Sequence, residues 1–418
     1  MKRILFSSFF IGLNFLVFAQ FSWTKYEFNQ VLQPGPDNFD IIAIGQPTVL
    51  FEEGTIKMWY AGVGNDMKAR LCYATSTDGI NWTKHGVVME VGGDGEWDRG
   101  WIDTPEVLKV PDGYYLSYYG DTIQQVAETN SAMGSAYSAD GITWTKDPEN
   151  PIFTKSEIGE WDGTWVESAA LYWDDVEEQI VMWYNGMDTA TWQLGIGVAT
   201  SPDGTTWTRY VGNPVIIHGI WGEPDDMWCG TPAVLYRNDK FEMWYSGTAA
   251  EDYSVELEGF ENVSICYATS EDGYNWAKYE GNPLFDTYTE PHNPDADLGG
   301  PWAPDVIYNE STETFMMWYE AHGGTSNYGF SLATAPLDVS EINRVKPGKN
   351  LVLYPNPVID YLNIQQDNFI SAEIYNLQGK LLIESNSSKI DVSELASGVY
   401  LLTISTKNGV ITKKIVKN

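Results

Sequence analysis

Short apolar segments that alternate with polar positions recur along residues 21–337. In the clearest copy, from Trp161 to Trp207, a loop containing Asp162 precedes one apolar segment and then a second that ends in Met-Trp-Tyr. A third segment ends in Ala-Thr-Ser and leads into a turn of the form Ser-x-Asp-Gly-x-x-Trp. Alternation with a period of two between turn residues is typical of β-strands. The pattern therefore predicts a repeated all-β unit.

The copies are counted by the end of their second strand. These ends are Met58-Trp59-Tyr60, Ser117-Tyr118-Tyr119, Met182-Trp183-Tyr184, Met243-Trp244-Tyr245 and Met317-Trp318-Tyr319. The turn is missing from the last copy, but its outer-strand residues occur near the chain start as Trp23-Thr24-Lys25. We therefore predict a five-bladed β-propeller over residues 21–337. Its N-terminal strand would pair with the last blade and so cover an open sheet edge.

The two ends of the chain predict export. Residues 1–19 have a Lys-Arg start and an apolar run, which is typical of a signal peptide. No other segment is apolar enough to span a bilayer, so the mature protein is expected to have no membrane span. Residues 338–350 are polar and unpatterned, as in a linker, and residues 351–418 alternate in short segments that predict a small C-terminal β-sandwich.

The net charge limits the possible partners, and the positions of the cysteines bear on disulfide bonds. The formal net charge is −34, and residues 351–418 contain six Lys against six Asp plus Glu, so the acidity lies before them. Such a surface repels nucleic acid and anionic membranes, and neither is expected as a partner. Cys72 and Cys266 occupy the same position of two repeats and are expected in separate cores, without a disulfide framework.

The C-terminal residues resemble a known export signal. They contain Tyr354-Pro355-Asn356-Pro357, Gly379-Lys380, Gly398-Val399-Tyr400 and Lys413-Lys414. In these motifs they are similar to the type A sorting domain of the type IX secretion system of Bacteroidetes. The resemblance implies the type IX machinery as a partner and a secreted or cell-surface location. It says nothing of the activity.

Candidate chemistry lies at the starts of the innermost strands, which converge on the axis of a propeller. An Asp precedes each of them, at Asp40, Asp98, Asp162, Asp225 and Asp297. Because this residue repeats in every copy, we interpret it mainly as a loop cap that binds backbone N–H groups. Function usually needs residues that break the repeat. Acids that break it are Asp103, Glu106, Glu167 and Asp305.

Carboxylates that face one another raise one another's proton affinity, so that one can act as an acid and another as a base. Cleavage of a glycosidic bond needs such a pair. Alternatively, these acids bind Ca²⁺ or water on the axis. Aromatic candidates for sugar stacking are Trp101, Trp165, Trp228 and Trp302, although the first three are better explained by packing between blades, and His322 is a further candidate contact.

The repeat resembles the five-bladed propellers of glycoside hydrolase family 43 and of the related families 32, 68 and 130. By the family 43 pattern, Glu167 matches the general acid and Glu106 matches the residue that modulates its pKa. The position of the general base is Gln46, which cannot accept a proton. The resemblance therefore implies the fold and a sugar ligand more strongly than the mechanism.

We expect a secreted glycosidase that acts on poly- or oligosaccharides and needs no cofactor or catalytic metal, with a structural Ca²⁺ left open. Glu167 would protonate the leaving oxygen, and Asp103 or Asp40 would replace the missing base. The alternative is a glycan-binding propeller that lost turnover through Gln46.

Overall fold

The computed structural model describes the propeller repeats and most of the C-terminal region. The described residues are 22–122, 132–188, 194–250, 253–254, 259–260, 263–291, 300–322, 328–336, 352–355, 357–365, 369–376, 380–406 and 409–417. The predicted signal peptide and the predicted linker lie outside them. The chain divides into two compact units, of which one is Ser22–Pro336 and the other contains Leu337–Asn418.

The described strands of residues 22–336 form antiparallel groups, each named here by its inner strand; a single parallel pairing, of Ala69 with Trp101, joins the first two groups into one sheet. The β2 group contains β2 (Ala43–Glu52), β3 (Thr55–Val63), β4 (Ala69–Ser76) and β5 (Thr83–Met89). The β6 group contains β6 (Trp101–Val110), β7 (Gly113–Asp121), β8 (Ala132–Ser138), β9 (Thr145–Lys146) and β10 (Phe153–Thr154). The β11 group contains β11 (Trp165–Asp174), β12 (Gln179–Met187), β13 (Leu194–Ser201) and β14 (Thr208–Arg209).

Two more groups complete this unit. The β15 group contains β15 (Trp228–Arg237), β16 (Lys240–Thr248), β19 (Val263–Ser270), β20 (Ala277–Lys278) and β21 (Phe285–Asp286). The β22 group contains β22 (Trp302–Asn309), β23 (Thr314–His322), β24 (Tyr328–Pro336) and β1 (Thr24–Lys25). A short separate hairpin joins β17 (Tyr253–Ser254) to β18 (Gly259–Phe260).

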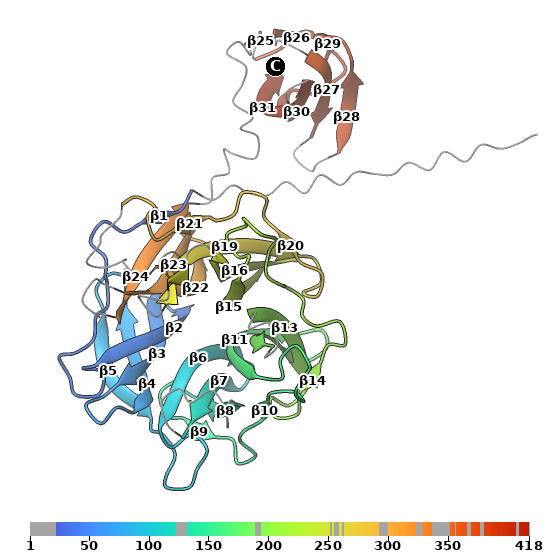
Figure 1. The fold of residues 1–418 in the computed structure, drawn as a ribbon. Coiled ribbons are helices and arrows are strands. Elements are labelled where there is room, and N and C mark those ends of the chain that lie inside the picture. Colours follow the sequence, from blue (N-terminus) through green and yellow to red (C-terminus); the bar gives the residue numbers. More distant parts are fainter. Residues whose placement is uncertain are drawn as a thin grey trace, which may run out of the picture. The chain divides into compact units, whose positions relative to one another are not determined.

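The inner strands surround a common centre (Figure 1). β2 contacts β6, β6 contacts β11, β11 contacts β15, β15 contacts β22, and β22 contacts β2 again. In the β22 group the outer strand comes from the chain start, because Thr24 pairs with Thr334 and Lys25 with Ala333. These groups therefore follow one another in a cycle, and residues near the starts of the inner strands come together.

Among the described residues, the Asp that precedes an inner strand is buried and forms a repeated ion pair. Asp40 is fully buried, and its Oδ2 accepts hydrogen bonds from Lys84 Nζ at 2.5 Å and Tyr60 Oη at 3.0 Å. The same arrangement joins Asp98 to Lys146, Asp162 to Arg209 and Asp225 to Lys278. Asp297 lies outside the described residues. The basic residue follows the turn tryptophan by two positions, so the repeat encodes both partners.

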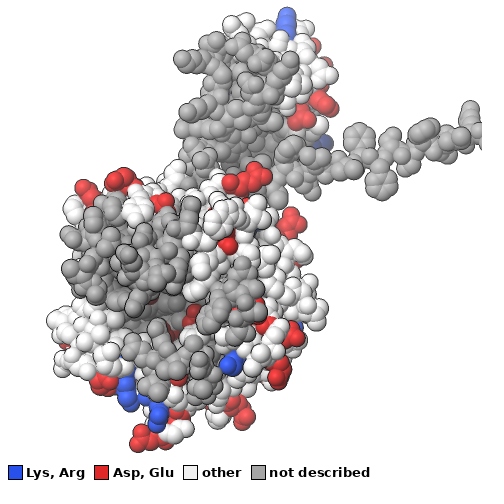
Figure 2. All heavy atoms as spheres, viewed as in Figure 1, with Lys and Arg blue, Asp and Glu red and all other residues white. Residues whose placement is uncertain are grey.

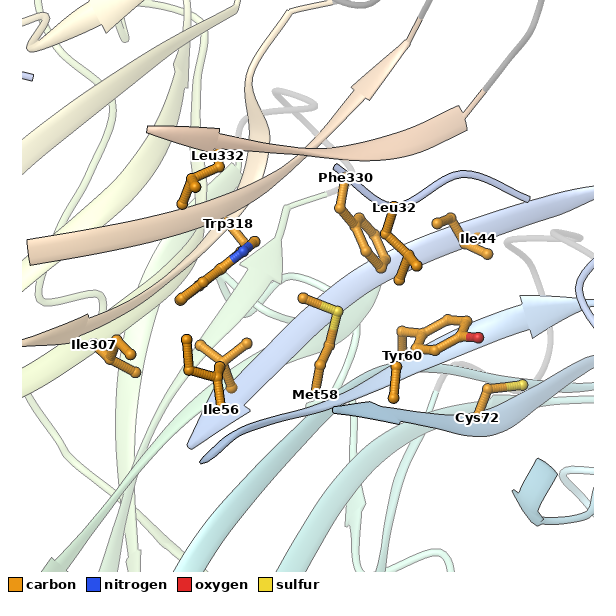
Figure 3. Packing of buried hydrophobic residues seen from close by; sticks show 12 residues of the cluster. Leu32, Ile44, Ile56, Met58, Tyr60, Cys72, Ile307, Trp318, Phe330 and Leu332 are labelled. Atoms are coloured by element: carbon orange, nitrogen blue, oxygen red, sulfur yellow. The ribbon is translucent and has the colours of Figure 1, made fainter. Parts of the chain in front are cut away.

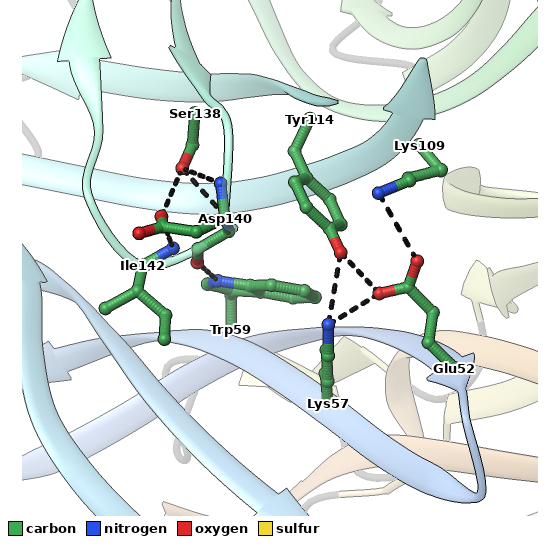
Figure 4. Close-up of polar contacts among 9 residues, drawn as sticks. Glu52, Lys57, Trp59, Lys109, Tyr114, Ser138, Asp140 and Ile142 are labelled. Atoms are coloured by element: carbon green, nitrogen blue, oxygen red, sulfur yellow. Dashed lines mark hydrogen bonds and ion pairs between the residues drawn. The ribbon is translucent and has the colours of Figure 1, made fainter. Parts of the chain in front are cut away.

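The Ser-x-Asp-Gly-x-x-Trp turn joins neighbouring groups. Asp140 Oδ1 accepts hydrogen bonds from the backbone N–H groups of Ile142 and Thr143, and the next residue, Gly141, has a φ of 76°. Only glycine adopts such a φ at little cost. The carbonyl of Gly141 accepts a hydrogen bond of 2.6 Å from Trp59 Nε1 of the preceding group (Figure 4). Trp183 and Trp318 make the same bond to Gly273 and Gly79.

Strand register corrects one step of the repeat alignment. Ser117 lies opposite Glu106, as Trp59 lies opposite Thr48, so Ser117 and not Tyr118 takes the place of the buried tryptophan. The second copy therefore ends in Leu116-Ser117-Tyr118, one residue earlier than predicted. In this copy Tyr115 makes the link to the β11 group instead. Its hydroxyl donates a hydrogen bond of 2.8 Å to the carbonyl of Gly204.

Apolar clusters fill the space between groups. Between the β22 and β2 groups, Trp318, Phe330 and Leu332 pack against Met58 and Tyr60 (Figure 3). Cys72 lies in this cluster and Cys266 in another, and the cysteines of the described chain, Cys72, Cys229 and Cys266, are buried and free. The expectation of separate cores for Cys72 and Cys266 is thus confirmed.

The C-terminal unit has a core of its own. One sheet contains β25 (Val352–Tyr354), β26 (Tyr361–Gln365) and β29 (Lys389–Asp391). The other contains β28 (Leu381–Ser385), β27 (Phe369–Tyr375), β30 (Gly398–Thr406) and β31 (Gly409–Lys417). Leu362 and Ile390 of the first sheet pack with Ile374 and Leu402 of the second, as in a β-sandwich. Gly379 of the Gly379-Lys380 motif lies outside the described residues.

Candidate active site

Each inner strand carries a β-bulge at the place where the repeat-breaking residues occur. The pairing register shifts between Gly45 and Thr48, and at the equivalent positions of the other inner strands. The residues at the bulges have positive φ angles of 37° to 49°, namely Gln46, Thr104, Ser168, Thr231 and Ala303. Left-handed backbone at residues other than glycine is strained, and bulges next to active sites commonly re-aim side chains. Side chains from adjacent inner strands are thereby directed toward the centre.

Asp103 and Glu167 form the central acidic pair. They occupy the same register position on β6 and β11, opposite Tyr119 and Asn185. The pKa of Glu167 is raised to about 7, mainly by burial and also by the Asp103 carboxylate beside it, while Trp165 and Asn185 partly oppose the shift. Burial likewise raises the pKa of Asp103 to about 6, against hydrogen bonds from Thr104 N and Trp101 Nε1. A carboxyl with a pKa near 7 is still partly protonated at neutral pH, so it can act as an acid there.

Glu320, on β23, completes this cluster and was missed by sequence reasoning. Its Oε2 accepts a hydrogen bond of 3.1 Å from the backbone N–H of Gln46. A Cβ added at Gly45 would lie 3.5 Å from Asp103 Oδ1 and 3.6 Å from Glu320 Oε2, so both carboxylates stand beside this glycine. Glu320 also contributes to the raised pKa of Asp103. We name Asp103, Glu167 and Glu320 the mouth acids.

A signal for Glu320 was present in the sequence. The residue that follows the Met-Trp-Tyr position is Ala61, Tyr119, Asn185, Ser246 or Glu320 in successive groups. Asn185 and Ser246 accept hydrogen bonds from the bulge N–H of the next group, as Glu320 does. The position therefore joins neighbouring groups, and only one of these residues is a carboxylate. Comparing copies at the second strand as well as the first would have found it.

Gln46 spans the centre of the ring. Its backbone N–H donates to Glu320, and its side-chain Oε1 accepts a hydrogen bond of 3.3 Å from Ser168 Oγ on β11. The β2 group and the β11 group are not neighbours in the cycle. The Gln46 side chain is thus oriented by a cross-ring contact as well as by its place in the strand.

Glu106 and Asp305 form a second pair, further along the inner strands than the mouth acids. Burial raises the pKa of both, that of Asp305 to about 7, and the Asp305 carboxylate raises the pKa of Glu106 further. Asp305 Oδ2 accepts from Val49 N at 2.5 Å, and Glu106 Oε1 accepts from Leu171 N at 3.3 Å. Each therefore links its strand to the next one. On their strands, Glu106 lies three residues beyond Asp103, and Asp305 lies three residues beyond Trp302, the equivalent position on β22.

The predicted aromatic residues are mostly engaged in packing. Trp101 is 7% exposed and clusters with Val63 and Tyr119, and Trp165 stacks on Tyr119 with ring centroids 5.6 Å apart. Trp228 and Trp302 are half-buried, and Trp302 pairs with Glu320 across β22 and β23. The side chain of His322 lies outside the described residues. Trp302 thus remains a candidate for stacking on a sugar.

Asp40 does not belong to the mouth. Its carboxylate is fully buried and bonded to Lys84, Tyr60 and the backbone N–H of Gly35. A carboxylate so engaged has no access to a substrate. Its role as a replacement base is therefore corrected to a structural one.

Metal binding is a separate question from the acid chemistry. Among the residues described, no group of three or more His, Cys, Asp or Glu side chains is arranged to hold a metal ion.

No helix in the described part of the protein is long and apolar enough to cross a membrane.

The raised pKa of Glu167 predicts a dependence of stability on pH. A carboxyl whose folded pKa of about 7 exceeds its ordinary 4.5 binds protons more tightly in the folded state. The free energy of unfolding is therefore lowered progressively as pH rises from about 4.5 to 7, and the full cost of the buried charge is present above 7. Glu167→Gln removes that cost, so the variant should gain melting temperature relative to wild type at pH 8 and little at pH 4.5. Calorimetry at both pH values measures this difference, and Glu310→Gln, on an exposed turn, should show none.

Comparison with family models matches two regions of the protein. Residues 95–252 match the glycosyl hydrolases family 32 N-terminal domain, and residues 352–418 match the secretion system C-terminal sorting domain. Beta-agarase D of Zobellia galactanivorans is 39% identical over 74 residues, which are 17% of this protein and 16% of the agarase. The match thus corresponds to a small part of that relative's length.

Solved structures match the repeated unit. A glycosyl hydrolase from Bacteroides ovatus has a TM-score of 0.57 at 17% identity, over 75% of this protein and 94% of the other. A thermostable family-43 glycoside hydrolase has a TM-score of 0.52 at 20% identity, over 70% of this protein and 88% of the other. At such identities the likeness shows the fold. The predicted resemblances are confirmed: the protein combines an all-β unit with the fold of propeller glycoside hydrolases and a type IX sorting domain, which directs it to the cell surface or the extracellular space.

Proposed function

We propose that the protein is a secreted glycosidase whose general acid is Glu167. The observation that carries the proposal is the pairing of Asp103 and Glu167 at the mouth, where burial and the neighbouring charge raise the pKa of Glu167 to about 7. A protonated carboxyl in that position donates its proton to the glycosidic oxygen as the bond to the sugar breaks. Asp103, next to it on β6, takes the part of the pKa modulator that the family pattern gave to Glu106.

Glu320 is the general base in this proposal. It stands at the backbone of Gln46, the position where the family 43 pattern has its base, and it is held there by the Gln46 N–H. The backbone hydrogen bond holds Glu320 Oε2 beside Asp103, and a carboxylate in such a position can take a proton from water. In this proposal the base lies on the second strand of the β22 group, whereas the family 43 pattern places it on the inner strand of the β2 group.

The architecture proposed with this function is a five-bladed propeller over residues 21–337 that is closed by the N-terminal strand. The cyclic contacts of the inner strands and the pairing of β1 with β24 support it. A signal peptide over residues 1–19, a linker over 338–350 and a sorting domain over 351–418 complete the proposed organisation. The proposed substrate is a poly- or oligosaccharide, and no cofactor is needed for the acid and base steps.

Two variants test the base. Glu320→Gln should reduce kcat by roughly a hundredfold or more on any accepted glycan, the scale of a lost acid or base. Gln46→Asp restores the family pattern, but it removes the bond to Ser168 and places a charge beside Glu320, so activity should fall. Both are measured on the arabinan, xylan, mannan or algal glycan that a hydrolysis screen of the wild type identifies. If Gln46→Asp instead raises activity and Glu320→Gln keeps the wild-type rate, Glu320 is not the base.

The glycan-binding alternative has a clear outcome in the same screen. A wild-type protein that binds one of these glycans and cleaves none would overturn the glycosidase proposal. The mouth acids favour the enzyme, because a site that only binds has no need of a carboxyl poised near neutral pH.

A further inference from the structure

A cavity of about 580 Å³ lies between the β6 and β11 groups, away from the mouth acids. Its lining includes Val110 at the end of β6, whereas Asp103 is near the start of that strand. Seven residues of strand separate the two, or roughly 23 Å at 3.3 Å per residue. A sugar bound in the cavity is therefore a different sugar from one bound at the mouth. The volume is that of a typical small-ligand site.

The cavity is lined where the β6 group departs from the repeat. Tyr137 occupies a position that is threonine in the other groups, at Thr75, Thr200, Thr269 and Thr334. Tyr137 is 39% exposed, and its hydroxyl donates to the carbonyl of Asp203 at 2.8 Å. That bond fixes the ring at the edge of the cavity. The Tyr137 ring meets Tyr115 edge to face with centroids 5.2 Å apart, and the part of the ring that stays exposed is a surface for a ligand that the four threonines do not offer.

A second aromatic and a fixed wall complete the apolar lining. Trp173, on β11, lines the cavity and is half-buried. Tyr114 also lines it, and its position is fixed by a 2.5 Å hydrogen bond to Glu52 and by Lys109 Nζ, 3.7 Å from its ring centroid (Figure 4). Aromatic rings with restrained positions are suited to stacking against the C–H face of a sugar ring.

The negative charge of the lining residues favours a ligand that carries no negative charge. The charged residues that line it are Asp112, Asp140 and Asp203, with no Lys or Arg among the lining residues. Backbone N–H groups lower the pKa of Asp140 to about 2 and also lower that of Asp203, so both stay ionised. Asp112 is exposed and makes no hydrogen bond or ion pair with a described residue, which leaves its carboxylate for ligand hydroxyls. Three carboxylates repel anions, and among the charged side chains visible in Figure 2 more are Asp or Glu than Lys or Arg.

We propose that this cavity is a second carbohydrate-binding site, which takes a neutral sugar ring between Tyr137 and Trp173 with Asp112 as hydrogen-bond acceptor. The choice of a sugar rests on the proposed function. Such a site would hold a polysaccharide on the protein while another part of the same polysaccharide occupies the mouth.

Native gel electrophoresis through soluble arabinan, xylan, mannan and polygalacturonate tests the site. At least one neutral glycan should retard the wild type and Glu167→Gln alike, and polygalacturonate should retard neither. Tyr137→Thr, which installs the residue of the other groups, and Asp112→Asn should each weaken retardation about fivefold or more, the scale of a lost stacking or polar contact. Phe51→Ala is the matched control, because Phe51 is the equivalent of Trp173 on β2 and is 42% exposed.

Two results would overturn the second site. Retardation that is the same in Tyr137→Thr, Asp112→Asn and the wild type overturns the second site, and so does the absence of retardation by every neutral glycan. Thermal unfolding of the variants shows whether a loss reflects misfolding, which would leave Asp112→Asn, an exposed hairpin change, as the deciding variant. The glycosidase proposal fails separately, if Glu167→Gln keeps the wild-type rate of cleavage.

Discussion

Glu167→Gln should lower kcat by roughly a hundredfold or more on every glycan that the wild type cleaves, the scale expected for a lost general acid. Glutamine keeps the size of the side chain and its contacts with Trp165 and Asn185 but has no proton to give. The same assignment fixes the pH profile. For the wild type, kcat should fall as pH rises through about 7, where Glu167 loses its proton.

Steady-state kinetics between pH 5 and 9 measures both effects. A substrate with a good leaving group, such as a nitrophenyl glycoside, needs less help from an acid, so the variant should recover much of its rate on it. Glu271→Gln, on an exposed turn, is the control and should behave as wild type. Wild-type turnover by Glu167→Gln would show that another group is the acid.

Trp318→Ala should lower the free energy of unfolding by about 3–5 kcal/mol, the cost of removing a large buried aromatic. Trp318 is fully buried between the β22 and β2 groups, where its Nε1 donates to the carbonyl of Gly79 at 3.0 Å and its ring meets Trp82 edge to face. The junction is the place where the end of the repeated unit meets its beginning. Its loss leaves a cavity and removes one of the two hydrogen bonds to the Gly79 carbonyl, to which Trp82 Nε1 also donates at 3.0 Å.

For a unit of this size, that loss corresponds to roughly 5–8 °C in melting temperature. Differential scanning calorimetry measures it. Trp221→Ala provides the control, because Trp221 is 80% exposed and its removal should change stability by no more than about 0.5 kcal/mol. If Trp318→Ala melts with the wild type, the junction between these groups does not limit stability.

The sequence determined the parts of this protein that repeat. Alternation placed the strands, the Ser-x-Asp-Gly-x-x-Trp turn placed the links, and the orphan Trp23-Thr24-Lys25 predicted the partner of β24. These features are local, since each depends on residues close in the chain or on copies of the same residues. The sorting motifs at the C-terminus were legible for the same reason. Even Asp103 and Glu167 could be predicted as a pair, because equal register on adjacent inner strands brings side chains together.

Only the tertiary structure decided what crosses from one group to another. The identity of Ser117 as the replaced tryptophan depended on strand pairing, since Tyr118 and Tyr119 offered an equally plausible alignment. Within one group, the fold pairs Asp40 with Lys84 on β5 and so buries Asp40 away from the mouth, and Glu106 and Asp305 lie beyond the bulges of their strands. Glu320 lies at the mouth although it belongs to the second strand of its group, and Gln46 accepts a hydrogen bond from Ser168 across the ring. A periodic sequence specifies each strand and its neighbours, but which atoms meet at the centre depends on how all the groups close around it.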